Sequence, residues 1–166
     1  MANDFQEFLT IAKELNGIKI TPLLIGSLGL EFLTDKDWQS KDIDIHVPGD
    51  ARGWSVPVEK QIYNWKSIQL VMKKLDYKLI NTHEHKFSKK NLLVEYGVLD
   101  TLTNFAEVRL VDLQNQTVQG VNFLIPTLSD YLKIYLASSK DSYRADHNNH
   151  KDFAKIAYLN KACKPQ

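Results

Sequence analysis

The sequence predicts a mixed α/β (α+β) fold in which a β-sheet is flanked by helices and followed by a short helical region. Three observations support it: apolar residues recur at helical spacing over 4–16, polar and apolar residues alternate over 41–47, and successive strand-like runs lie between 77 and 98. We expect an α/β core at residues 1–125 and a helical extension at 126–166, packed together as one structural unit.

The composition is that of an ordinary globular protein, with 43% hydrophobic and 25% charged residues among 166. The 21 basic and 20 acidic side chains leave a net charge of +1, so no global field attracts a polyanion and long nucleic acid is not an expected partner. The single cysteine, Cys163, cannot close an intrachain bridge. Apolar stretches are too short to cross a bilayer and the N-terminus is polar, so we expect a cytoplasmic protein without membrane contact.

Four elements are expected in the first part of the chain: a helix at 4–16, a strand at 18–25, a short helix at 28–33 and a strand at 41–47. Since side chains alternate along a strand, Asp42 and Asp44 share one face of the last of these. Residues 49–57 contain Gly and Pro and are expected to form a loop with Arg52 and Trp54 exposed.

The rest of the chain continues the alternation of helix and strand patterns. We expect a long helix at 58–75, strands at 77–82, 85–88 and 92–98, a hairpin of 108–113 and 116–123 around Gln114-Asn115, and helices at 128–138 and 150–160. The sheet should hold four or five strands before the hairpin is added.

The residues most suggestive of chemistry are the two aspartates that share a face. Asp42 and Asp44 project side by side, which suits a hard divalent cation such as Mg²⁺ or Mn²⁺ that also holds phosphate oxygens. Upstream, an apolar strand delivers Gly26 and Ser27 to the start of a helix, where backbone amides and a hydroxyl can cradle a phosphate. The alternatives are a solvated strand face and a plain strand-to-helix turn.

The order Gly26-Ser27, short helix, Asp42-Ile43-Asp44-Ile45 resembles the signature of the DNA polymerase beta-like nucleotidyltransferase superfamily. The resemblance implies a nucleotidyltransferase-type sheet, phosphate contacts from Gly26 and Ser27, and Mg²⁺ binding by Asp42 and Asp44. The 14 residues between Ser27 and Asp42 form a slightly longer spacer than the family typically has, and an extended loop around 35–40 would absorb it.

Members of that superfamily that catalyse transfer commonly carry a third carboxylate on a later strand. Glu95 in the run 92–98 is the candidate for it, as both catalytic residue and metal ligand, with Asp100 as the fallback. Such a group could take the proton from an acceptor hydroxyl. The alternative for Glu95 is a surface acid on the sheet.

The C-terminal region resembles that of small bacterial nucleotidyltransferases related to abortive-infection antitoxins. Aminoglycoside nucleotidyltransferases are the alternative group that the chain resembles. The resemblance implies that Lys140, Arg144 and Lys151 face the nucleotide, and the alternative is a charged helical face that keeps the tail soluble. The histidine pairs His83/His85 and His147/His150 lack the further ligands of a zinc site, and we expect none.

These features lead to one functional hypothesis and a rival. The hypothesis is a Mg²⁺-dependent nucleotidyltransferase that moves an NMP group from an NTP to a hydroxyl of an acceptor, which is a small molecule or a protein. The rival is a catalytically degenerate nucleotidyltransferase fold that serves as a nucleotide-binding or protein-interaction module. A metal-dependent phosphohydrolase is less expected, because it would need more metal ligands than the sequence offers.

Overall fold

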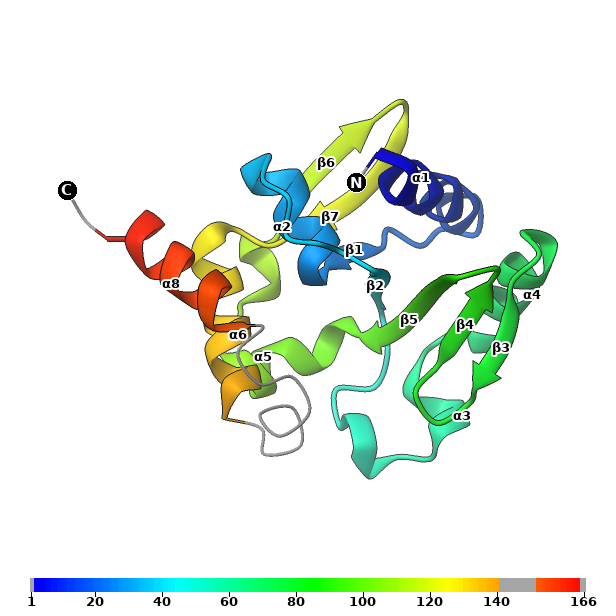
Figure 1. Cartoon of the computed structure of the whole chain (residues 1–166). Helices are drawn as coiled ribbons and strands as arrows, with labels where there is room; N and C mark the ends of the chain where they lie inside the picture. Colours follow the sequence, from blue (N-terminus) through cyan, green and yellow to red (C-terminus); the bar gives the residue numbers. More distant parts are fainter. Residues whose placement is uncertain (1, 141–151, 165–166) are drawn as a thin grey trace. The chain divides into compact units, whose positions relative to one another are not determined.

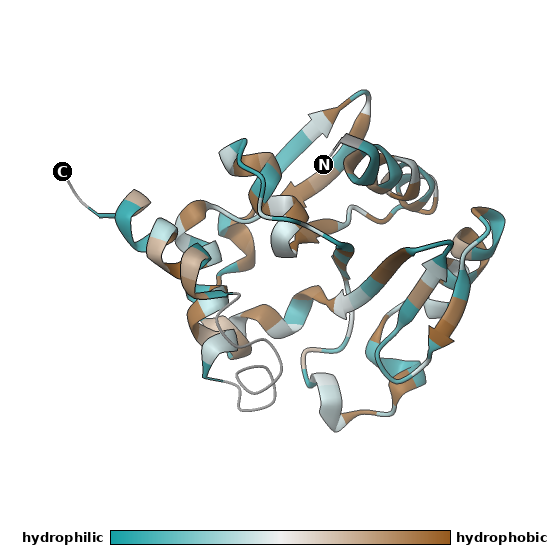
Figure 2. Ribbon diagram, in the orientation of Figure 1, coloured by the Kyte–Doolittle hydropathy of each residue, from teal (hydrophilic) through white to brown (hydrophobic). Residues whose placement is uncertain are grey.

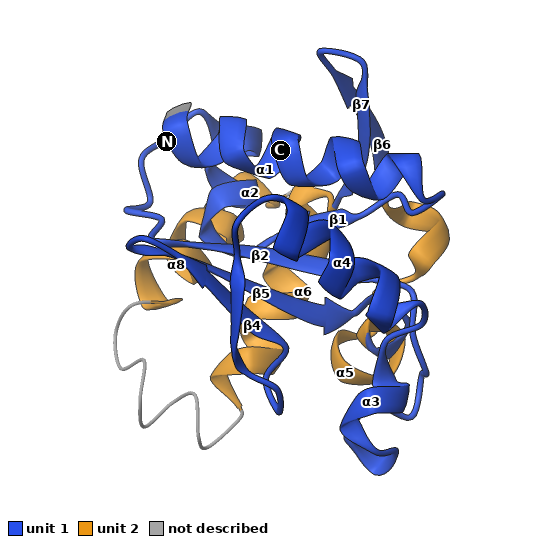
Figure 3. Ribbon diagram, turned by 90° about the vertical axis from the view of Figure 1, so that its right-hand side faces the viewer, with its two compact units in different colours: residues 1–101, 114–125 blue, residues 102–113, 126–166 orange. Residues whose placement is uncertain are grey.

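The computed structural model describes residues 2–140 and 152–164 and divides the chain into two compact units (Figures 1 and 3). Unit 1 comprises residues 1–101 and 114–125, and unit 2 comprises residues 102–113 and 126–166. The segment 102–113 therefore groups with the C-terminal helices, whereas the sequence-based division at 125 placed it in the core.

Within the described residues, seven strands form one mixed sheet, and all of them belong to unit 1. In chain order they are β1 (Leu23–Ile25), β2 (Asp42–Val47), β3 (Lys78–Asn81), β4 (Lys86–Lys89), β5 (Leu92–Val98), β6 (Gln114–Val118) and β7 (Val121–Ile125). The spatial order is β3-β4-β5-β2-β1-β7-β6. The pairs β2–β5 and β1–β7 are parallel and the other neighbours are antiparallel, which confirms the predicted mixed sheet flanked by helices.

The helices divide between the units. Unit 1 contains α1 (Ala2–Gly17), α2 (Gly26–Thr34), α3 (Val58–Gln61) and α4 (Trp65–Lys74), and unit 2 contains α5 (Leu102–Ala106), α6 (Leu128–Ser139) and α8 (Phe153–Ala162). Short 3₁₀ turns lie at Gly53–Ser55, Leu99–Thr101 and Leu110–Asp112. No helix in the described part of the chain is both long and apolar enough to cross a bilayer.

One face of the sheet forms the core of unit 1, and apolar residues follow its strands and helices (Figure 2). Helix α1 packs there through Phe8, whose ring meets Phe123 of β7 edge-on with centroids 5.2 Å apart. Helix α4 packs through Trp65, which contacts Phe87 of β4 and Tyr96 of β5. The burial of these rings leaves the opposite face of β2, β4 and β5 for other side chains.

The long helix predicted at 58–75 is interrupted. It splits into α3 and α4, because Ile62 is extended and bridges to Gly49, and Asn64 adopts a left-handed conformation with φ 59°. Tertiary pairing of the chain with an earlier loop thus overrides the local helical pattern. The helix predicted at 28–33 is found, as α2, and ends at Asp35 in a left-handed cap.

The hairpin predicted around Gln114-Asn115 is displaced. Residues 114 and 115 lie within β6, and the turn is formed by Gln119 and Gly120 with φ values of 52° and 77°. Two positive φ angles in a two-residue loop give the mirror-image turn that matches the twist of a hairpin. The strand predicted at 18–25 is also shortened to β1, because the amides of Ile18 and Ile20 bond back to the carbonyl of Leu15.

Candidate functional site

Asp42 and Asp44 lie on the face of β2 that the core helices do not cover. The intervening Ile43 and the following Ile45 are completely buried, while Asp42 is exposed and Asp44 is half-buried. Period-two alternation therefore separates the strand into an apolar side and a carboxylate side. Two carboxylates, separated in the sequence by one residue, therefore reach the same surface of the sheet.

Gly26 brings the start of α2 directly against Asp44. The neighbouring Ile25 pairs with Asp44 across the antiparallel β1–β2 ladder, and Gly26 has φ +75°. A Cβ built on Gly26 would overlap Asp44 Oδ2 and lie 3.1 Å from its Cγ. Only glycine allows this approach, which places the carboxylate beside the electropositive end of a helix.

Glu95 lies opposite Asp44 on the neighbouring strand. The parallel register pairs Asp44 with Glu95, and residues paired across a ladder project from the same face. Asp100, the fallback for the third carboxylate, instead accepts a hydrogen bond from the amide of Gly49 at 2.9 Å and anchors the loop after β2. Of the two acids, Glu95 is the one that the sheet brings to the carboxylate side.

The donor set suits Mg²⁺, which is usually held by one or two carboxylates together with phosphate oxygens and water. Three carboxylates reach one face, and the cradle beside Asp44 would be filled by a Cβ at Gly26. Among residues 2–140 and 152–164 no three Asp, Glu, His or Cys side chains form a preformed metal-binding group. The residues present therefore fit a metal whose coordination is completed by water or by phosphate oxygens.

A lysine shares the face with these acids. Lys86 pairs with Glu95 across the antiparallel β4–β5 ladder, and its Nζ lies 3.0 Å from Glu84 Oε2. The pKa of Lys86 is raised, first by the hydrogen bond to Glu84, and also by the negative charges of Glu95 and Asp42. The ammonium thus lies within the field of the carboxylate side.

His46 extends the same face one step beyond Asp44. It pairs with Gly97 of β5, and a Cβ on that glycine would lie 2.5 Å from His46 Nε2, so the missing side chain makes room for the ring. Its Nδ1 is buried and has no hydrogen-bond partner among the described residues. Burial lowers the pKa of His46 to about 4, so the imidazole is neutral at physiological pH.

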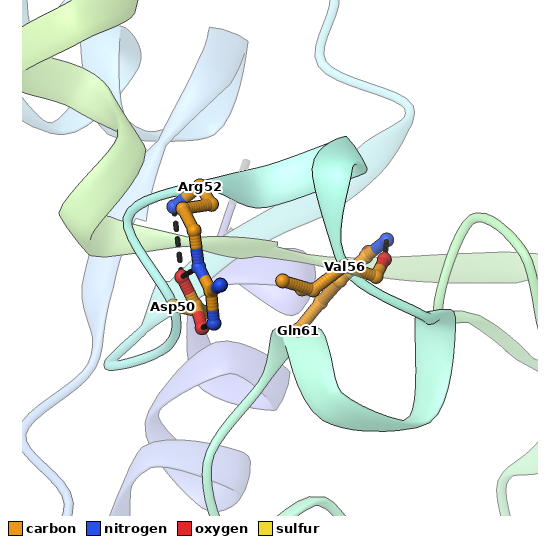
Figure 4. A network of polar contacts seen from close by, with 4 residues as sticks. All are labelled: Asp50, Arg52, Val56 and Gln61. Carbon is orange, nitrogen blue, oxygen red and sulfur yellow. Dashed lines mark hydrogen bonds and ion pairs between the residues drawn. The ribbon is translucent and has the colours of Figure 1, made fainter.

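The loop after β2 is held in place by a set of local contacts (Figure 4). Arg52 Nη2 lies 2.7 Å from Asp50 Oδ2, and the same arginine lowers the pKa of Asp50 to about 2. The side-chain Nε2 of Gln61 donates a hydrogen bond to the carbonyl oxygen of Val56 at 3.0 Å. Trp54 remains 69% exposed, in agreement with the predicted loop, and its ring lies 4.9 Å from that of His83.

The remaining candidate residues are distributed over the chain. Ser27 is the second residue of α2, directly after Gly26. Lys140 caps the C-terminus of α6 in unit 2 and is exposed, while Arg144 and Lys151 lie outside the described residues. His85 packs edge-on against Trp65, and its Nε2 lies 3.2 Å from the carbonyl oxygen of Val58.

Comparison with known proteins identifies the family. No protein-family model matches the sequence. The chain is 38% identical over 158 residues to the uncharacterized protein YnaI of Bacillus subtilis (strain 168), and the match covers 95% of this chain and 96% of that protein. The chain belongs to the YnaI family.

Two solved structures share the fold of this YnaI family member. The antibiotic-resistance factor ANT(2'')-Ia matches with a TM-score of 0.63 at 12% identity, covering 97% of this chain and 85% of that one. An antigenic nucleotidyltransferase-like protein from Paracoccidioides brasiliensis matches with a TM-score of 0.59 at 15% identity, covering 95% and 75%. At identities this low the TM-scores show the fold alone: the YnaI family member has the nucleotidyltransferase-type fold that its sequence predicts.

Sequence reasoning missed two residues of the carboxylate side, Lys86 and His46. Lys86 lies on a strand without acids, and only the β4–β5 register shows that it shares the face of Glu95. For His46 a signal was available, because it continues the alternation of Asp42 and Asp44 by one more step.

Proposed function

We propose that this chain is a Mg²⁺-dependent nucleotidyltransferase that moves the nucleoside monophosphate group of an NTP to an acceptor hydroxyl. The position of Asp44 supports the proposal most directly, since it lies against Gly26 on one side and opposite Glu95 on the other. Asp44 therefore adjoins each of the other groups that the superfamily pattern requires, namely the turn proposed to bind phosphate and the proposed third carboxylate.

Each group has a role that follows from its chemistry. The amides of Gly26 and Ser27 and the Ser27 hydroxyl bind phosphate oxygens at the start of α2. Asp42, Asp44 and Glu95 would hold Mg²⁺, which when bound neutralises phosphate charge and orients the reacting group. We also assign nucleotide contacts to Lys140, Arg144 and Lys151, on the basis of the family resemblance alone.

The reaction balances with these residues. The acceptor oxygen forms a bond to the α-phosphorus, the bond from that phosphorus to the β-phosphate oxygen breaks, and pyrophosphate leaves with the electron pair. Glu95 takes the proton of the hydroxyl as general base. The acceptor is a small molecule or a protein, since a net charge of +1 offers no extended field for long nucleic acid. We place the reaction in the cytoplasm, as the sequence predicts.

The alternative is a nucleotidyltransferase fold that binds nucleotide or protein without transfer. It requires only Asp42 and Asp44 rather than three carboxylates, and the described residues contain no preformed group of three metal-binding side chains. In that case a metal-nucleotide complex would bind, and no NMP would be transferred to any acceptor.

The test is calorimetric titration with non-hydrolysable ATP, GTP, CTP and UTP analogues in Mg²⁺. The wild type should bind at least one analogue, and Asp44→Asn should weaken binding more than about 100-fold, since even outer-shell changes cost 10–100-fold in metal sites. Asp76→Asn is the matched control, because Asp76 is exposed, follows α4 and adopts φ 70°, which asparagine tolerates.

Two results would contradict the proposal: no binding by the wild type, or equal binding by the wild type and Asp44→Asn. If binding is established, α-labelled NTP and candidate acceptors separate the transferase from the alternative. Antibiotics are the first acceptors to screen, because one structural neighbour is an antibiotic-resistance factor.

A further inference from the structure

The carboxylate side of the sheet contains its own cation. Lys86 of β4 faces Glu95 of β5, which in turn faces Asp44 of β2, so a cation and two acids form one row across three strands. Asp42 lies one step along β2 on the same face, and its charge also acts on Lys86. With its side chain 26% exposed, Lys86 is partly withdrawn from water, which strengthens these interactions.

Lys86 has a second partner away from the row. Its Nζ lies 3.0 Å from Glu84 Oε2, in the turn between β3 and β4. Glu84 therefore holds the ammonium at the edge of the carboxylate side, within the field of Asp42 and Glu95. A lysine has three donors on a flexible stem, so the same head group can bind Glu84 and still turn toward another anion.

Charge balance on this face changes when substrate binds. Clustered carboxylates repel one another, and a nearby ammonium relieves that repulsion. A divalent cation bound to the same carboxylates neutralises their charge and weakens their attraction for the ammonium. The triphosphate that accompanies the metal then supplies new oxygens for a lysine that is already in place.

We propose, on the basis of the function inferred above, that Lys86 is the resident counter-cation of this site: it balances Asp42 and Glu95 before the metal binds and binds a phosphate oxygen of the triphosphate afterwards. Lys86 is thus a substrate-binding residue of this chain that lies on the sheet itself. Glu84 is the positioning residue that keeps it there.

The proposal predicts effects of opposite sign from one substitution. Lys86→Met keeps the length of the stem and removes the charge, so Mn²⁺ alone should bind about 2–5-fold tighter, because an unfavourable neighbour is lost. In the presence of saturating Mn²⁺, inorganic tripolyphosphate should bind about 10-fold or more weakly, because a charged hydrogen bond is lost. Mn²⁺ binding is followed by electron paramagnetic resonance, and tripolyphosphate binding by calorimetry.

Two further variants sharpen the test. Lys78→Met removes the same charge from β3, where Lys78 is exposed and lies three strands from Asp42, so both affinities should match the wild type. Glu84→Gln releases Lys86 toward the carboxylates, so Mn²⁺ alone should bind more weakly while tripolyphosphate binding is retained.

The outcomes separate this inference from the proposed function. If wild-type Mn²⁺ binding depends on Asp44 but Lys86→Met moves both affinities in the same direction, or neither, then Lys86 is not the counter-cation and the proposed function stands. If the wild type binds neither Mn²⁺ nor tripolyphosphate, both proposals are wrong.

Discussion

The two faces of one sheet differ in what their residues do for the protein. On β2, β4 and β5 one face carries the buried isoleucines of β2 together with Phe87 and Tyr96, whose rings contact Trp65 of α4. The other face carries Asp42, Asp44, Glu95 and Lys86. Adjacent residues of the same strand therefore have different roles. The apolar face stabilises the fold by burial, and the polar face holds groups whose charges have a cost unless they are paired or bind a ligand.

Stability and binding can therefore be altered separately by substitutions at neighbouring positions of one strand. A change at an odd position of β2 should act on unfolding, and a change at an even position should act on binding.

Ile45→Ala should lower the free energy of unfolding by about 2–5 kcal/mol, because it opens a cavity at a completely buried site. Its neighbour Asp44→Asn should change the same quantity by less than about 1 kcal/mol, because its side chain is only half-buried. Urea unfolding of the two variants measures both. Equal losses of stability would show that the two faces are not separable.

Gly26→Ala should weaken Mn²⁺ binding about 10-fold or more, because the new Cβ displaces the Asp44 carboxylate. Its strain at positive φ should also cost about 1–2 kcal/mol of stability. Gly120→Ala is the control, since it has φ +77° and nothing within 4 Å of its Cβ, so it shares the strain without touching a carboxylate. Matching Mn²⁺ affinities in the two variants would refute the contact as a determinant of binding.

Glu31→Gln should give the smallest effect, about 1 kcal/mol or less, and its sign should depend on pH. Glu31 is 1% exposed in α2, its Oε2 accepts a hydrogen bond from the Trp38 amide at 2.8 Å, and its pKa is raised by burial and by Asp37. A raised pKa means that the folded state favours the protonated acid. Its contribution to stability is therefore complete below its ordinary value of 4.5 and declines as pH rises through the folded value.

Glutamine stays neutral throughout, so the stability of Glu31→Gln relative to the wild type should increase from pH 4 to pH 8. Denaturant midpoints at each pH measure the difference. If the stability of Glu31→Gln instead fell relative to the wild type as pH rises, the carboxylate would be stabilised in its charged form, against the prediction.

Sequence patterns predicted what depends on local periodicity. The alternation of Asp42, Ile43, Asp44 and Ile45 placed both aspartates on one face, and the Gly26-Ser27 turn was expected to open a helix. These features are set by neighbouring residues along the chain, so single-sequence reasoning can reach them.

What could not be predicted depends on pairing between distant segments. The break between α3 and α4 requires the Gly49–Ile62 bridge, which joins residues that no local pattern relates. The place of Lys86 beside Glu95 depends on the β4–β5 register, and a shift of one residue would send it to the opposite face. The position of the turn in the β6–β7 hairpin likewise depends on the register of the two strands, which pairs Val118 with Val121.

The parallel pairing of β1 with β7 sets a condition on synthesis. Leu23 lies beside Leu124, and the amide of Leu124 donates to the carbonyl of Pro22 at 2.8 Å, although 101 positions separate Leu23 from its partner. A ribosome adding about 5–20 residues per second needs about 5–20 s to cover that separation. Until β7 has been synthesised, the edge of β1 that β7 covers in the folded protein has no partner strand, and an unpaired edge can pair with other chains.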